Sequence, residues 1–149
     1  MSPPCEHPHQ PSDETSIPSG LFPVLLVILV SFAFFPGLNN PFVDWDDPEY
    51  VVRNPLIRSL SPDNLTRQFT SFVSSHYHPL TIFSYSLEYA LVGLKPFLYH
   101  FDNLLLHLFN TLLIYLFLRR LSQNRQLAFL AALVWGIHPL KVESVAWVS

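Results

Sequence analysis

Four acidic residues lie within six positions of one another in the segment FVDWDDPEY, residues 42–50: Asp44, Asp46, Asp47 and Glu49. A carboxylate in such a cluster can act as a general base that takes the proton of a substrate hydroxyl. A neighbouring carboxylate can hold a divalent cation through its hard oxygen atoms. Asp46 and Asp47 are the candidates for these two tasks.

The same segment also has a purely structural interpretation. Asp47 is a good helix N-cap, Pro48 suits the first helical position, and Glu49 favours the positive end of the helix dipole. The dipeptide at 54–55, Asn-Pro, would close this short helix. Because cap patterns are common, chemistry alone favours the structural interpretation, although it leaves Asp46 without a task.

A polar stripe runs along an apolar segment near the middle of the chain. Asn103, His107 and Asn110 are spaced i, i+4 and i+7, which places them on one helical face, with Asp102 beside its outer end. Such residues at membrane depth face a bundle interior or a wet cavity and mark functional sites. Hydrogen bonding between helices is an equal alternative. We expect more helices than this chain supplies to receive the stripe.

The seven histidines do not predict a zinc site. His76 and His78 point to one side only if the backbone is extended, and neither an H-E-x-x-H motif nor a cysteine partner accompanies them. His138 is followed by Lys141 and Glu143 at the outer end of a third apolar segment. These residues are predicted on the same side of the membrane as the acidic cluster, where they could meet it.

The composition indicates a membrane protein. Half of the 149 residues are hydrophobic and 13% are charged, whereas about a quarter are charged in an average soluble domain. The eight Lys and Arg residues form no basic cluster with interleaved aromatics, so nucleic acid is excluded as a partner. The single cysteine, Cys5, can form no internal disulfide.

Apolar segments predict about three membrane spans after a disordered, proline-rich tail at residues 1–20. Residues 21–38 are uncharged over 18 positions, close to the roughly 20 that a helix needs to cross the hydrocarbon. Residues 99–118 form the second span. Residues 127–149 form a third span and the start of the next external loop, and the chain ends there in mid-segment, as a truncated chain would.

The orientation follows from the loops. A cleaved signal peptide is the alternative for residues 21–38, but no positive n-region or small-x-small cleavage site accompanies them. The loop at 119–126 is short and holds three arginines, and such loops stay in the cytoplasm. We therefore predict an all-α polytopic membrane protein with a cytoplasmic N-terminus and a helical extracytoplasmic loop at 39–98, between the first two spans.

Two helices are predicted inside that loop. Ser61 caps a helix that starts at Pro62 and runs toward Phe72. The stretch at 78–94 places four apolar side chains on one helical face before Gly93 ends the helix: Leu80, Phe83, Leu87 and Leu91. The tripeptide NLT at 64–66 fits a glycosylation sequon, a short pattern that also arises by chance.

Three stretches in order resemble a known family: FVDWDDPEY, YHPLTIFSYSLEYALVGLKPFLYHFDNLLLHLFN and GIHPLKVESVAWVS. They resemble the N-terminal part of the TMTC-like proteins, transmembrane and tetratricopeptide-repeat members of the C-type membrane glycosyltransferase superfamily that are related to protein O-mannosyltransferases. The resemblance covers residues 36–149. It implies an external loop that opens with an acidic pair, matched here by Asp46 and Asp47, and it favours an active-site loop over a cap.

The resemblance also implies the reaction. An acceptor hydroxyl, in eukaryotic members a protein Ser or Thr, attacks the anomeric carbon of a sugar such as mannose on a polyprenyl-phosphate donor, with inversion if no covalent sugar intermediate forms. Asp46 or Asp47 would act as the base or bind Mn²⁺ or Mg²⁺, and no nucleotide is needed. The partners are the bilayer, of the bacterial inner membrane or the endoplasmic reticulum, the donor and a protein acceptor.

Five further residues are candidates for binding substrate or its phosphate: His78, His107, His138, Lys141 and Glu143. His78 stands where the family commonly has Arg, so a fixed positive charge becomes pH-dependent. Lys141 departs from a frequent HPxH pattern. Both departures weaken the transfer of phosphate or metal roles to these positions.

The chain is much shorter than the members of the family it resembles, and this leaves competing hypotheses about its function. The family continues through many more spans and then repeats, so most of the donor cavity would come from chain outside these residues, and we expect the isolated chain to be inactive. The alternative is a small non-enzymatic membrane protein, or a degenerate remnant, whose external loop binds a partner. A secreted protein released by signal cleavage is a third class.

Overall fold

The computed structural model describes residue 18 and residues 20–148. Helices and helical turns follow one another along this part of the chain: α1 (Leu21–Phe34), η1 (Phe35–Asn39), η2 (Pro48–Val52), η3 (Pro55–Arg58), α2 (Pro62–Thr70), α3 (Pro79–Val92), α4 (Pro96–Ser122), α5 (Arg125–Gly136), η4 (Pro139–Lys141) and α6 (Val142–Ala146). Its β pairing is limited to an isolated bridge between Val73 and His76, so the predicted all-α class is confirmed. The predicted disordered tail falls largely on residues 1–17 and 19, outside the described residues.

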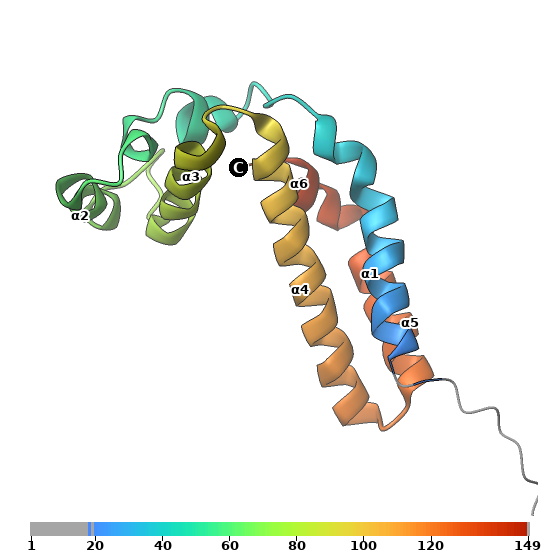
Figure 1. The fold of residues 1–149 in the computed structure, drawn as a ribbon. Coiled ribbons are helices and arrows are strands. Elements are labelled where there is room, and N and C mark those ends of the chain that lie inside the picture. The colour runs from blue at the N-terminus through green and yellow to red at the C-terminus, as the bar shows by residue number, and fades with distance from the viewer. Residues whose placement is uncertain (1–17, 19, 149) are drawn as a thin grey trace, which may run out of the picture.

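Helices α1, α4 and α5 form one bundle, and α2 and α3 lie to one side of it (Figure 1). The run Leu21–Asn39 and helix α4 are each long and apolar enough to cross a membrane. At 1.5 Å per residue, the 27 residues of α4 reach about 40 Å, more than the roughly 30 Å of hydrocarbon. The polytopic architecture is therefore confirmed.

The third apolar segment is bent. Helix α5 and the stretch Pro139–Ala146 pass the same test only together, with an angle of 56° between them. Pro139 explains the break, because a proline keeps the preceding residue out of the helical region. His138 accordingly has an extended backbone, with φ −61° and ψ 135°.

Small residues bring the bundle together. The buried positions of α5 are Ala128, Ala132 and Gly136, spaced four apart. A Cβ on Gly136 would lie 3.0 Å from Val30 of α1 and 3.1 Å from Thr111 of α4. The three helices therefore lie close together where Gly136 has no side chain.

The segment between the first two candidate spans has its own core. Val51, Ile57, Ile82 and Tyr99 are buried in it. The predicted cap is confirmed, since the Ser61 hydroxyl accepts the Asn64 N–H at 3.4 Å. Helix α3 ends at Gly93, whose φ of 66° suits glycine.

The packing of α3 leaves much of its predicted apolar face exposed. Its buried residues are Ile82, Tyr85, Ser86 and Glu88. The predicted apolar face forms, but Leu80, Leu87 and Leu91 on it point out of the described structure. The predicted apolar pattern is confirmed, but these leucines do not pack into the core of the described residues.

The predicted sequon lies in a helix. Asn64 is in the first turn of α2, and its side-chain amide donates hydrogen bonds to the carbonyls of Leu56 and Ser59, each at 2.5 Å. The folded protein therefore uses this amide to hold η3 against α2.

Candidate functional site

The four clustered carboxylates occupy different environments. Asp47 is fully buried, and its Oδ2 accepts the backbone N–H of Val43 at 2.8 Å. Asp47 occupies the N-cap position of η2, as the structural interpretation predicts, but its side chain makes no capping bond to the turn that follows. The Asp46 carbonyl starts that turn instead, accepting the N–H groups of Glu49 and Tyr50, both at 3.0 Å. Asp47 therefore ties the acidic loop back onto itself.

Asp46 is exposed and faces a hollow. It lines a cavity of about 300 Å³ whose other walls come from η2, α3 and the end of the described chain: Tyr50, His78, Thr81, Tyr85 and Val148. The structure thus brings together one predicted catalytic residue and one predicted phosphate ligand. Their position follows from α3, which carries His78 at its N-cap and Thr81 and Tyr85 on its first two turns.

The C-terminal end of the described chain closes one side of this cavity. The Tyr85 hydroxyl donates to the Val148 carbonyl at 2.7 Å. The rings of Trp45 and Trp147 lie 6.2 Å apart. The segment GIHPLKVESVAWVS therefore does meet the acidic loop, as expected, but through residues 147–148.

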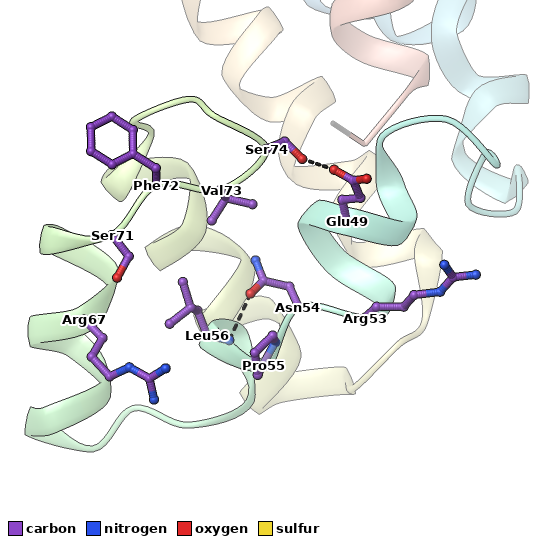
Figure 2. A pocket seen from close by; sticks show the side chains of 10 residues that line it. All are labelled: Glu49, Arg53, Asn54, Pro55, Leu56, Arg67, Ser71, Phe72, Val73 and Ser74. Carbon is purple, nitrogen blue, oxygen red and sulfur yellow. Dashed lines mark hydrogen bonds between the residues drawn. The ribbon is translucent and has the colours of Figure 1, made fainter.

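Glu49 belongs to a second hollow, of about 470 Å³. Figure 2 shows its carboxylate turned toward Ser74, whose hydroxyl donates to it. Arg53 and Arg67 line the same hollow, but the Arg53 guanidinium group points away from the Arg67 side chain (Figure 2). The two arginines therefore do not form a clamp for one anion. Asp44 is exposed, so only Asp46 of the four acids faces the aromatic cavity.

The phenols of the Asp46 cavity stay protonated. Burial raises the pKa of Tyr50, and the negative charges of Asp46 and Glu49 raise it further. Burial also raises the pKa of Tyr85, with Glu88 adding to the effect. The Asp46 carboxylate therefore faces neutral hydroxyl groups around neutral pH.

The polar stripe of α4 makes interhelical hydrogen bonds. His107 is buried, and its Nε2 lies 2.8 Å from the carbonyl oxygen of Gly136. The Asn103 amide donates to the carbonyl of Trp147 at 2.8 Å. Asn110 is exposed. The interhelical alternative is thus confirmed for His107 and Asn103, and the expectation that further helices must receive them is wrong, because the bend after α5 turns backbone carbonyls toward α4.

The remaining candidates surround that bend. The Nδ1 of His138 accepts the Leu140 N–H at 3.3 Å, which caps η4. The Lys141 ammonium lies 4.5 Å above the Trp135 ring. Glu143 is exposed in the first turn of α6. These three residues thus lie on the turn that leads toward the Asp46 cavity.

Three residues that line the cavity were not predicted from the sequence: Tyr50, Thr81 and Tyr85. A signal for two of them was present, because His78, Thr81 and Tyr85 are spaced i, i+3 and i+7 and so share a helical face. Tyr50 lies in the acidic motif itself. The apolar stripe on another face of α3 dominated the pattern.

The described residues do not form a metal site by themselves. Among residue 18 and residues 20–148, no group of three or more His, Cys, Asp or Glu side chains is arranged to hold a metal ion. Asp46 and Asp47 differ in exposure, and Asp47 is engaged with Val43. A Mn²⁺ or Mg²⁺ ion at Asp46 would need further donors from outside these residues.

Comparison with known proteins identifies the relatives. No protein-family model matches the chain, and no solved structure matches it. It is 34% identical over 120 residues to protein O-mannosyl-transferase TMTC1 of Mus musculus, covering 74% of this chain and 13% of that protein. It is 36% identical over 132 residues to protein O-mannosyl-transferase TMTC3 of Mus musculus, covering 83% and 14%.

A third relative comes from an invertebrate. The chain is 32% identical over 135 residues to protein O-mannosyl-transferase F38B6.6 of Caenorhabditis elegans, covering 81% of this chain and 19% of that protein. The chain thus spans less than a fifth of the length of these relatives. The matches extend over most of its own residues and agree with the membrane architecture, and the chain therefore belongs to the TMTC-like proteins.

Proposed function

We propose that this chain forms part of a membrane glycosyltransferase that moves a sugar from a polyprenyl-phosphate donor to a protein hydroxyl. The relatives' names suggest mannose as the sugar. The observation that carries the proposal is the exposed Asp46 carboxylate in a cavity walled by Tyr50, Thr81 and Tyr85. A carboxylate among hydroxyl groups suits the binding and deprotonation of an acceptor Ser or Thr.

In the proposed reaction, Asp46 takes the proton of the acceptor hydroxyl as its oxygen attacks the anomeric carbon of the sugar. The bond between that carbon and the donor's phosphate oxygen breaks, and the electron pair leaves with the polyprenyl phosphate. Without a covalent sugar–enzyme intermediate the anomeric configuration inverts. His78, in the same cavity, would favour the phosphate when its ring is protonated.

Asp47 has a different role in this proposal. Its buried carboxylate holds the loop through the Val43 N–H. It therefore positions Asp46 without touching the substrate. Asp46→Asn should lower transfer, whereas Asp47→Asn should lower the amount of folded protein.

The rest of the site is proposed to come from further polypeptide. The chain covers 13% of TMTC1 and 14% of TMTC3, and the bound donor requires more cavity than about 300 Å³. An immunoblot of native membranes with an antibody against residues 21–148 measures the size of the endogenous protein. A band several times larger than 17.1 kDa supports this proposal. A band at that size favours the non-enzymatic, partner-binding alternative.

We also propose that the N-terminus is cytoplasmic and that the acidic loop lies on the other side. Arginines 119, 120 and 125 flank the short turn between α4 and α5, and such turns stay in the cytoplasm. Modification of Ser75→Cys by a membrane-impermeant maleimide, in sealed vesicles of known orientation and a Cys5→Ser background, tests this. Labelling from the cytoplasmic face would contradict the orientation.

The catalytic proposal is tested by comparing two substitutions in native membranes. Asp46→Asn should lower sugar transfer at least about 100-fold, the usual effect of losing a general base, with unchanged abundance. Asp44→Asn is the matched control, since Asp44 is exposed in the same loop, and it should leave transfer within about twofold. Unchanged transfer in Asp46→Asn would refute the catalytic role.

A further inference from the structure

The hollow of about 470 Å³ that contains Glu49 adjoins the Asp46 cavity. Glu49 and Arg53 border the hollow, whereas Asp46 and Tyr50 border the cavity. All four residues belong to η2 or flank it closely, so one helical turn forms a wall of both spaces. A polypeptide that lies in the hollow can therefore continue past this turn into the cavity.

Two arginines of the hollow have no partner in the described part of the chain. Arg53 and Arg67 are both exposed, and neither guanidinium group has an ion pair or a hydrogen bond among the described residues. Glu49 is the one acidic residue of the lining and already accepts the Ser74 hydroxyl. The lining thus carries two positive charges against one negative charge, which favours an occupant with carboxylates.

The direction of the arginines indicates the kind of occupant. The Arg53 guanidinium group points away from the Arg67 side chain (Figure 2), so one small anion cannot bridge the two. Carboxylates at separate positions of one chain can reach both. The hollow therefore suits an acidic polypeptide better than a free phosphate or a single carboxylate.

The segment 71–73 offers backbone hydrogen bonds to such a chain. Ser71 has an extended backbone, with φ −107° and ψ 156°. Val73 and His76 exchange two backbone hydrogen bonds, of 3.0 and 2.9 Å. In such a pair the backbone groups of the adjacent residue point to the opposite edge. Those of Phe72 have no hydrogen-bond partner among the described residues, and an extended peptide can pair with an edge of this kind.

Two contacts hold this edge in position. Ser74 and Ser75 form the centre of the turn that follows it, with φ of 48° and 67°, a left-handed conformation that serine seldom adopts. The Ser74 hydroxyl donates to Glu49 (Figure 2), and the Tyr50 hydroxyl lies 3.5 Å from the Nδ1 of His76. Both contacts fix the turn to the wall shared by the two spaces. An edge that is ordered in advance costs less entropy to occupy.

We propose that the hollow bordered by Glu49, Arg53 and Arg67 binds an extended, acidic segment of the acceptor protein, adjacent to the Ser or Thr that receives the sugar. The segment pairs with the backbone of Phe72, and its carboxylates approach the two arginines. The target hydroxyl then reaches Asp46 in the adjoining cavity. The inference rests on the proposed function for the identity of the acceptor, and it adds a preference for acidic residues around the target hydroxyl.

The test measures binding without sugar transfer, by the fluorescence anisotropy of labelled peptides added to the full chain in phosphatidylcholine nanodiscs. The acidic peptide has a central Thr with Glu residues on both sides, and Gln replaces every Glu in the neutral peptide. A third peptide keeps the acidic side chains but has ester linkages in place of the Glu amide N–H groups, which removes donors for strand pairing. All three comparisons use the parental chain, so they do not depend on the folding of a variant.

The contribution of the arginines is tested with the double substitution Arg53→Gln and Arg67→Gln. Arg120→Gln is the matched control for net charge. Arg120 is exposed in the last turn of α4, and this end of α4 lies far from α2 and the hollow (Figure 1). Variants are compared when their melting temperatures match that of the parent.

The acidic peptide should bind the parent at least about fivefold more tightly than the neutral peptide, the effect of about 1 kcal/mol from charge pairs. The ester peptide should bind about fivefold more weakly than the acidic peptide, because it cannot donate to the strand edge. The double variant should lose the preference for the acidic peptide, and Arg120→Gln should keep it.

Equal binding of the acidic and neutral peptides would overturn the proposal. An equal loss of preference in Arg120→Gln would also overturn it, because the attraction would then be general. Full affinity of the ester peptide would exclude strand pairing. The reaction is tested separately by Asp46→Asn. Absent peptide preference together with Asp46-dependent transfer would refute this inference alone, whereas the expected peptide binding with unchanged transfer in Asp46→Asn would refute the proposed function.

Discussion

The bundle of candidate spans and the segment between its first two helices are stabilised differently. The bundle packs α5 through Ala128, Ala132 and Gly136 against larger side chains of α1 and α4. The intervening segment surrounds its core with buried polar side chains that are hydrogen-bonded, such as Asn54 and Gln68. Lipid gives no hydrophobic drive for helix association, so close contact matters there. A segment beside water has that drive and can satisfy buried polar groups within its core.

The largest loss of stability is expected from adding a side chain at Gly136, where the three helices of the bundle lie close together. Gly136→Val should destabilise the protein by about 3 kcal/mol, because a Cβ alone would approach Val30 and Thr111 to 3.0 and 3.1 Å. The strain would also disturb the hydrogen bond between His107 and the Gly136 carbonyl. Thermal unfolding in nanodiscs, followed by tryptophan fluorescence, measures the change.

The matched control for this substitution is Gly20→Ala. No described residue has an atom within 4 Å of a Cβ built on Gly20, so the melting temperature of this variant should stay close to that of the parent. Equal effects of the two substitutions would show that close helix contact does not stabilise the bundle.

The second-largest loss of stability is expected from removing a buried polar side chain in the core of the intervening segment. The fully buried Gln68 amide donates to the Leu56 carbonyl at 2.7 Å and to the Ser86 hydroxyl at 2.8 Å. Gln68→Ala should cost about 2 kcal/mol through lost hydrogen bonds to buried groups. Exposed Gln126→Ala should change stability by less than about 0.5 kcal/mol. If Gln68→Met, which keeps the volume, retains full stability, packing rather than hydrogen bonding holds this core.

The third prediction concerns Glu88, which should make the stability of the folded protein depend on pH. Burial, then the negative charge of Asp102 and a hydrogen bond to it, raise the pKa of Glu88 from 4.5 to about 8. The folded state then binds this proton more tightly than the unfolded state does. The resulting stability is complete below the unfolded pKa and is lost as the pH rises to about 8. The slope in that window is at most about 1.4 kcal/mol per pH unit.

Glu88→Gln should remove this slope, because the amide cannot ionise. Melting temperatures of both proteins between pH 5 and about 8 provide the comparison. Glu143→Gln, at an exposed site in α6, should keep the parental slope. A pH profile of Glu88→Gln that matches the parent would mean that Glu88 ionises freely in the folded protein.

The smallest losses of stability are expected from removing one helix N-cap in each region. The Asn124 side chain accepts the N–H groups of Gln126 and Leu127 at 3.0 and 3.1 Å, whereas Ser61 accepts a single N–H at 3.4 Å. Asn124→Ala should therefore cost about 1 kcal/mol and Ser61→Ala about 0.5 kcal/mol. The same melting experiment ranks them, and the reverse order would show that bond number and length do not set cap strength here.

Local signals predicted much of the fold. Pro62 and Gly93 mark the start of α2 and the end of α3, as expected, because backbone restrictions act within a few residues. The apolar lengths of the first two candidate spans were also readable. The third candidate span was harder to predict, because it bends at Pro139. The angle of this bend depends on packing against α4.

The candidate site was only partly predictable. Sequence spacing identified the acidic cluster and the family resemblance identified His78, but neither separated the role of Asp46 from that of Asp47. The structure buries Asp47, turns Glu49 to Ser74 and leaves Asp46 in the cavity with Tyr85. The surroundings of Glu49 and Asp46 come largely from residues at least 25 positions away in the sequence, which no local pattern records.

The sequence by itself determined that this protein is helical, rich in apolar spans and equipped with an acidic loop, because chain length, hydrophobicity and turn chemistry are local properties. Only the tertiary structure decided which carboxylate faces the cavity, which face of α3 points outward, and that His107 and Asn103 bond to backbone carbonyls. These outcomes depend on how helices distant in sequence pack. Packing determines whether a side chain is exposed, which groups it contacts and how readily it ionises.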